Sequence, residues 1–137
     1  ITDVDSTLLP TGRYVDVANT PFDFSQQKAI ETQSNKSHPL YELVCGYDHN
    51  YVLLPSVEGQ PQAKVASSDT GICMSLYTDL PGLQFYTGSL QSTSQLGALC
   101  LEPQYFPDSP NRPEFPDCIA TPEAPYKAYI RYTFEHI

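Results

Sequence analysis

One short segment places a carboxylate, an imidazole and an amide between two tyrosines, where a strand is expected to begin. The segment reads Gly46-Tyr47-Asp48-His49-Asn50-Tyr51. An aromatic face stacks on the C–H face of a saturated ring, while carboxylate and amide groups hydrogen-bond to hydroxyls. This combination suits a sugar. The alternative is a strand that begins with an Asp turn whose hydrogen bonds are all satisfied within the protein.

A second candidate is a glutamate that follows an apolar run. Glu102 comes directly after Ala98-Leu99-Cys100-Leu101. A carboxylate at the end of a buried strand is partly desolvated, which raises its pKa and makes it a stronger base. The alternative is a glutamate at the rim of the protein that points to water.

The third candidate is an amide inside an apolar strand. Gln84 lies between Leu83 and Phe85, and a buried amide needs hydrogen-bond partners. Those partners are either a bound ligand or a neighbouring stretch of backbone, and the residue alone leaves both interpretations open.

Other kinds of site find little support. The sequence contains no GxSxG motif, no glycine-rich phosphate loop and no CxxC pair, and His38, His49 and His136 lack metal-ligand spacing. The formal net charge is -9, which argues against nucleic acid and against anionic membranes. Apolar runs such as Tyr51–Leu54 are also too short to span a bilayer. We therefore expect no metal, no nucleic acid and no membrane partner.

The cysteines and the start of the chain bear on its compartment. Cys45, Cys73, Cys100 and Cys118 allow three disulfide pairings, but we favour four reduced thiols in a β core. The chain begins at Ile1 with no initiator Met and no leader, so it is either a mature product or a piece of a longer protein. We expect a cytoplasmic location, with secretion as the alternative.

Composition and patterning predict an all-β chain. The 137 residues are enough for one domain. The 13 prolines disfavour long helices, whereas the frequent Val, Ile, Thr, Tyr and Phe suit strands. Alternating apolar residues and turn signals predict seven or eight strands at sandwich-like spacing. Among them are residues 14–17, 47–54, 62–67, 72–78, 83–87, 98–102 and 128–134.

The connections between these strands carry further signals. The turn-like Ser68–Gly71 is expected to join two strands into a hairpin. Residues 25–32 admit one helical turn with Ser25 as its cap, and residues 89–95 form a Ser/Gln-rich loop. Residues 103–125 contain seven prolines, and their embedded aromatic residues favour an ordered loop packed on the domain.

Taken together, six segments resemble the C-terminal part of the aldose 1-epimerase family, also called galactose mutarotases. The matching stretches are Asp5–Gly12, Asn19–Phe24, Gly46–Leu53, Leu83–Gly88, Leu99–Gln104, and Phe106–Asn111 continuing to Phe115-Pro116. Their order and approximate spacing also match, so the resemblance covers nearly all of the chain. It implies a large antiparallel β-sandwich, within which residues 1–137 form either a single domain or the C-terminal part of one.

The resemblance implies isomerisation of free aldoses such as glucose and galactose without a cofactor. A general base removes the proton of the C1 hydroxyl, a general acid protonates the ring oxygen, and the opened ring closes on its other face. By match of motif, Glu102 is the base, while Asp48 and Gln84 bind the sugar. These roles take precedence over the local alternatives for Asp48 and Glu102.

The chain also departs from the family pattern. A family member is normally more than twice as long, and its acid histidines and a substrate-binding arginine lie in the N-terminal half, which has no match here. His49 falls within a matched motif but corresponds to neither acid histidine. The loop at residues 89–95 is shorter than usual, and Pro103 follows Glu102 where Thr or Ser is expected.

Two functions are compatible with these residues. The first is an aldose 1-epimerase whose acid histidine comes from an N-terminal half or a second subunit. The second is a non-catalytic carbohydrate-binding or structural remnant of the family. An epimerase of hexose 6-phosphates is disfavoured because phosphate sites need arginines, and the chain has only Arg13, Arg112 and Arg131.

Overall fold

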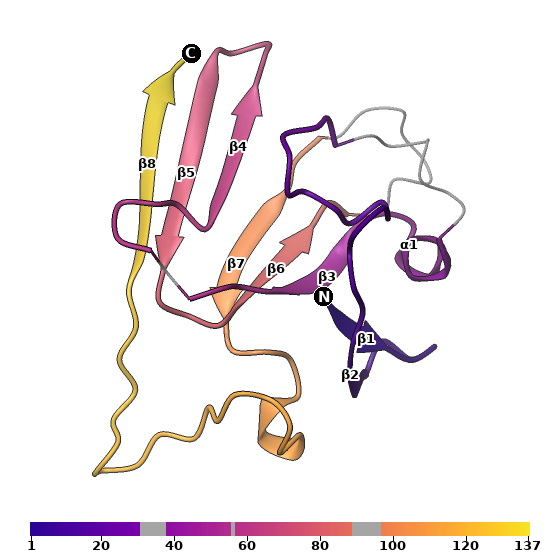
Figure 1. Cartoon of the computed structure of the whole chain (residues 1–137), viewed down its shortest axis with the longest axis vertical. Helices are drawn as coiled ribbons and strands as arrows, with labels where there is room; N and C mark the ends of the chain where they lie inside the picture. The colour runs from indigo at the N-terminus through magenta and orange to yellow at the C-terminus, as the bar shows by residue number, and fades with distance from the viewer. Residues whose placement is uncertain (31–37, 56, 89–96) are drawn as a thin grey trace.

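The residues that the structure describes form three antiparallel sheets (Figure 1). The computed structural model describes residues 1–30, 38–55, 57–88 and 97–137. Its elements are β1 (Thr2–Val4), β2 (Pro10–Tyr14), α1 (Pro39–Val44), β3 (Asp48–Val52), β4 (Ala63–Ser67), β5 (Ile72–Thr78), β6 (Gly82–Tyr86), β7 (Cys100–Gln104), the 3-10 helix η1 (Ser109–Asn111) and β8 (Ile130–His136). The sheets have the strand orders β1-β2, β3-β6-β7 and β4-β5-β8. The described residues thus confirm the predicted antiparallel all-β fold.

The predicted hairpin is present between β4 and β5. The two strands pair from Ala63 opposite Leu76 to Ser67 opposite Ile72, and the turn between them ends at Gly71. That glycine has a φ of +68°, a left-handed conformation that costs glycine little because it has no Cβ. The strand β8 pairs with the other edge of β5, so the hairpin becomes a three-stranded sheet.

The single helical turn predicted at residues 25–32 is wrong for residues 25–30, which the structure describes. Ser25 does not cap a helix there, because its N–H and hydroxyl both donate to the Asp23 carboxylate, at 3.0 and 2.6 Å. The helix forms instead at α1. Pro39 occupies its first turn, where a missing N–H costs nothing, and the His38 side chain caps it by accepting from the Leu40 N–H.

Several strand boundaries differ from the predicted ones because pairing, rather than local alternation, decides where a strand ends. The strand β7 runs over Cys100–Gln104, in register with Tyr86–Gly82 of β6, and not over residues 98–102. The first hairpin places its second strand at Pro10–Tyr14 instead of residues 14–17. The predicted Ser/Gln loop at residues 89–95 lies outside the described residues.

The main core covers one face of the β3-β6-β7 sheet. It consists of Ile1, Phe22, Tyr41, Tyr47 and Phe85, all less than 8% exposed. The rings of Phe22 and Tyr41 meet Tyr47 edge to face, with centroids 5.8 and 5.3 Å apart. Such aromatic pairs contribute beyond the area they bury, so this face is held rigidly and fixes the strands that carry the site.

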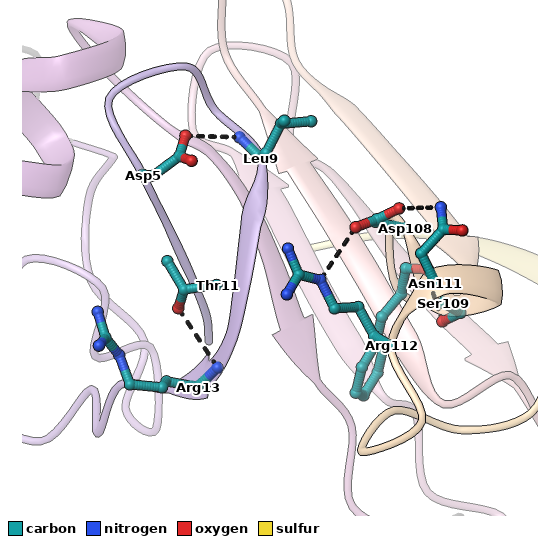
Figure 2. A network of polar contacts seen from close by, with 9 residues as sticks. Asp5, Leu9, Thr11, Arg13, Asp108, Ser109, Asn111 and Arg112 are labelled. Atoms are coloured by element: carbon teal, nitrogen blue, oxygen red, sulfur yellow. Dashed lines mark hydrogen bonds and ion pairs between the residues drawn. The ribbon is translucent and has the colours of Figure 1, made fainter.

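The proline-rich segment forms the expected ordered loop. Its Phe106 and Phe115 are buried and pack edge to face, with centroids 5.3 Å apart, and Tyr14 of β2 lies against both. Figure 2 shows the polar contacts around this loop and the first hairpin: Asp108 accepts from Arg112 at 3.0 Å and from Asn111 at 2.6 Å. The ring contacts of Tyr14 join the loop to β2, and the polar contacts of Asp108 hold the turn around η1.

Among the described residues, no disulfide joins any of the four cysteines. Only Cys73 is buried, whereas Cys100 is exposed and the other two are half-buried. The prediction that all four lie in a β core is therefore wrong for three of them. Among the described residues, no helix is both long and apolar enough to cross a membrane.

Candidate functional site

The three predicted site residues lie on one face of the β3-β6-β7 sheet. Gln84 of the central strand stands opposite Asn50 on one side and Glu102 on the other. Residues directly opposite each other in an antiparallel pair point to the same face. Asn50, Gln84 and Glu102 therefore form one cross-strand row. Asp48 lies two residues from Asn50 along β3 and so shares this face.

Asp48 and Gln84 are joined directly. The Gln84 Nε2 donates to the Asp48 Oδ1 at 2.7 Å, although the two residues are 36 positions apart in the chain. The partner of the Gln84 amide is thus a side chain in the site and not the backbone. This hydrogen bond holds the carboxylate in one orientation, with its remaining lone pairs able to accept from hydroxyl groups.

Glu102 is not desolvated, contrary to the prediction. It lies in the middle of β7 and is exposed, because the strand continues through Pro103 to Gln104. Among the described strands, β7 is an outer strand of its sheet, as is β3, and an edge position tolerates proline. The carboxylate is free to accept a proton from a hydroxyl that reaches this face, but the described residues leave it open to water.

The opposite face of the same strands belongs to the core. His49, Phe85 and Leu101 form a cross-strand row there, in register with one another. His49 is 2% exposed and lies against Phe22, with ring centroids 4.4 Å apart. Burial disfavours the charged imidazole and lowers the pKa of His49 to about 4. This histidine is therefore neutral at pH 7 and turned away from Glu102.

The other two histidines are also distant from the row. His38 caps α1 and packs edge to face on Phe22, with ring centroids 5.0 Å apart. His136 lies at the end of β8, in a different sheet. All three histidines of the chain belong to the described residues, and none of them shares the site face.

The arginines are occupied elsewhere. Arg13 donates to the Asp3 carboxylate at 2.9 Å, and Arg112 donates to Asp108. Arg131 lies over the Tyr77 ring, with its guanidinium carbon 4.1 Å from the centroid. The described residues also contain no group of three or more His, Cys, Asp or Glu side chains that could hold a metal ion. Asp48 and the Asn50-Gln84-Glu102 row therefore offer carboxylate and amide groups.

Sequence reasoning missed two neighbours of these residues. Tyr86 and Cys100 stand in the next cross-strand row with Asp48, and both are exposed. The Tyr86 ring offers a stacking face beside the carboxylate. Asn50 was named as a polar neighbour but not as a site residue, although its spacing of two residues from Asp48 signals a shared face.

The chain is similar to known sugar epimerases along nearly its whole length. The model of the aldose 1-epimerase family matches residues 1–133. Galactose mutarotase from Mus musculus is 35% identical over 96% of this chain, and aldose 1-epimerase from Escherichia coli is also 35% identical over 96%. The chain spans about two fifths of the length of these relatives, 40% and 41% respectively.

A solved structure shows the same similarity in three dimensions. A GalM/aldose epimerase homologue from C. elegans superimposes with a TM-score of 0.70 at 27% identity, over 99% of this chain and 43% of that one. Galactose 1-epimerase from Lactobacillus acidophilus shares the fold, with a TM-score of 0.65. The matched family model, the relatives and the shared fold all agree, and we conclude that this chain belongs to the aldose 1-epimerase family.

Proposed function

We propose that this chain is the base-bearing part of an aldose 1-epimerase that interconverts the α and β anomers of free aldohexoses such as glucose and galactose. The observation that supports this most is the shared sheet face of Glu102, Gln84 and Asp48, with Gln84 bonded to Asp48. Carboxylates and amides at a stacking surface recognise a polyhydroxylated ring, and the reaction requires no cofactor.

In the proposed reaction, Glu102 accepts the proton of the C1 hydroxyl as the bond between C1 and the ring oxygen breaks. The ring oxygen leaves with a proton from a general acid and becomes the C5 hydroxyl. Rotation about the C1–C2 bond and reclosure by the reverse proton transfers give the other anomer. Asp48 and Gln84 hold sugar hydroxyls so that C1 stays within reach of Glu102.

The general acid comes from outside this chain in our proposal. His49 faces the core, and His38 and His136 belong to other parts of the structure. An N-terminal half or a second subunit would supply an acid histidine. The same segment would cover the exposed β7 edge and remove water from Glu102, which would make its carboxylate a stronger base.

Polarimetry of freshly dissolved α-glucose and α-galactose tests this proposal. The chain is measured alone and together with the part of the Escherichia coli relative that it does not match. We expect acceleration in the combined sample and a loss of about 10²–10⁴-fold in the Glu102→Gln variant, as is typical for removing a general base. Glu135→Gln is the matched control, because Glu135 is also an exposed strand carboxylate but lies on β8.

Two outcomes would count against an epimerase. Equal rates for the wild type and Glu102→Gln would remove the proposed base. An uncatalysed rate in the combined sample, with sugar binding intact, would favour a non-catalytic carbohydrate-binding protein of the same family.

A further inference from the structure

Three buried polar atoms on the site face have no hydrogen-bond partner among the described residues. They are the Asn50 Nδ2, the Asn50 Oδ1 and the Gln84 Oε1. Asn50 is only 3% exposed. Buried amides in proteins are nearly always satisfied, and leaving one unpaired costs free energy in the empty protein. The unpaired atoms are explained if this face binds a ligand that forms hydrogen bonds with them.

The pairing of β3 with β6 brings the unpaired atoms of Asn50 and Gln84 next to each other. Asn50 stands directly opposite Gln84, so the side chains of the two residues are adjacent. The Gln84 Nε2 is committed to Asp48 at 2.7 Å. That bond orients the amide and leaves its Oε1 as the free end. The two carboxamides together offer one N–H donor group and two carbonyl acceptors.

The far side of Asn50 is closed by the sheet and the proline-rich loop. Gly82 has no side chain here, and a Cβ at this position would come within 2.5 Å of the Asn50 Oδ1 and 2.9 Å of the Phe106 Cδ1. Phe106 itself is 4% exposed. The Asn50 carboxamide is therefore packed close to Gly82, where the Phe106 ring and the Gln104 carbonyl also approach, and Gln84 stands opposite it on β6.

We propose that Asn50 is a further sugar-binding residue, which together with the Gln84 Oε1 receives one hydroxyl group of the monosaccharide at the inner end of the site. A hydroxyl donates one hydrogen and also accepts, so it can accept from the Asn50 Nδ2 and donate to the Gln84 Oε1, which gives partners to two of the three unpaired atoms. The inference rests on the proposed function. It adds a contact that distinguishes sugars with this hydroxyl from sugars without it, because a sugar without it would leave the same amide atoms unpaired.

The test is sugar binding measured by ligand-observed NMR on the whole chain. D-Galactose, D-glucose and their 2-, 3-, 4- and 6-deoxy analogues are titrated into the wild type, Asn50→Leu and Gly82→Ala. Asn50→Leu keeps the branched shape and the number of heavy atoms of the side chain but has no polar atoms, and Gly82→Ala presses on an intact Asn50. Ser75→Ala is the control, since Ser75 is also a buried polar strand residue but lies in the β4-β5-β8 sheet.

We expect both variants to weaken binding of the parent sugars by about three- to tenfold, the loss typical of one hydrogen bond. One deoxy analogue should bind the wild type and Asn50→Leu equally, because it lacks the hydroxyl that Asn50 receives. The Tm of Asn50→Leu should be unchanged or higher, since the substitution removes two unpaired buried atoms. Ser75→Ala should bind all sugars as the wild type does.

The opposite results would overturn the inference in distinguishable ways. Suppose that the wild type binds sugars and that Asn50→Leu binds each sugar as tightly as the wild type does, with a lower Tm. Asn50 is then a structural residue, and the proposed function still stands. If the wild type binds no sugar, the proposed sugar site of this chain fails and the role of Asn50 fails with it.

Discussion

The two faces of the β3-β6-β7 sheet are built from alternating residues of the same strands, yet they have opposite properties. One row, His49-Phe85-Leu101, is packed into an aromatic core, while the row beside it, Asn50-Gln84-Glu102, carries polar groups. Successive strand residues point to opposite faces, so adjacent residues of one strand belong to the packed core face and to the polar face in turn. The core row holds the strands in place, and the polar row uses their fixed register to assemble a site from distant parts of the chain.

The largest test of this contrast compares two adjacent residues. Phe85→Ala should destabilise the chain by about 3–5 kcal/mol, the cost of a cavity in a packed core, which is a large share of a typical domain's stability. Gln84→Ala should cost less than about 1 kcal/mol, because it removes one hydrogen bond and also one unpaired atom. Urea unfolding followed by circular dichroism measures both. If the two variants lose similar amounts of unfolding free energy, the proposed difference between the core face and the polar face is wrong.

A smaller effect is expected from the buried imidazole on the core face. The folded chain lowers the pKa of His49 to about 4, whereas an unfolded histidine titrates near 6.5. Between these values the unfolded state binds more protons, so stability rises with pH and is lost on acidification. The free energy of unfolding should fall by about 2 kcal/mol from pH 7 to pH 5 on account of His49.

The pH dependence is measured by urea unfolding at pH 7, 6 and 5. His49→Phe should flatten this dependence, whereas His136→Gln on exposed β8 should leave it as in the wild type. A His49→Phe variant that keeps the full wild-type slope would show that another group is responsible.

The smallest expected effect concerns the bond between Asp48 and Gln84 on the polar face. A double-mutant cycle with Asp48→Ala and Gln84→Ala should give a coupling of about 1 kcal/mol, a value typical of a hydrogen bond to a charged acceptor that is partly open to water. A cycle with Asp48→Ala and Gln104→Ala should give none, because Gln104 lies on the far side of the Gln84 row from Asp48. Equal couplings in both cycles would mean that the observed 2.7 Å contact carries no specific energy.

Prediction from sequence worked best where a local pattern is sufficient. The alternation of residues 72–78 and the turn ending at Gly71 identified a hairpin that the structure confirms. It failed where a side chain had competing partners. Ser25 was expected to cap a helical turn, but it bonds to Asp23, and the helix begins instead at Pro39, where His38 provides the cap.

For the candidate site, the sequence identified residue types and the structure decided their surroundings. Asp48, Gln84 and Glu102 were chosen from aromatic neighbours, apolar flanks and a family resemblance. Their shared face follows from strand pairing, which no single segment contains. The exposure of Glu102 agrees with the alternative of a glutamate at the rim, because burial at the end of an apolar run depends on what covers the strand, and β7 is an outer strand among those described.

The order of apolar and polar residues along the chain was enough to determine that it forms antiparallel strands and which side chains alternate along each one. The tertiary structure alone decided that β6 lies between β3 and β7, and so brought Gln84 to Asp48 and Glu102. The physical reason is that alternation is a property of one strand, with a repeat of two residues. Register arises from the burial of an entire face, to which residues far apart in the sequence contribute together.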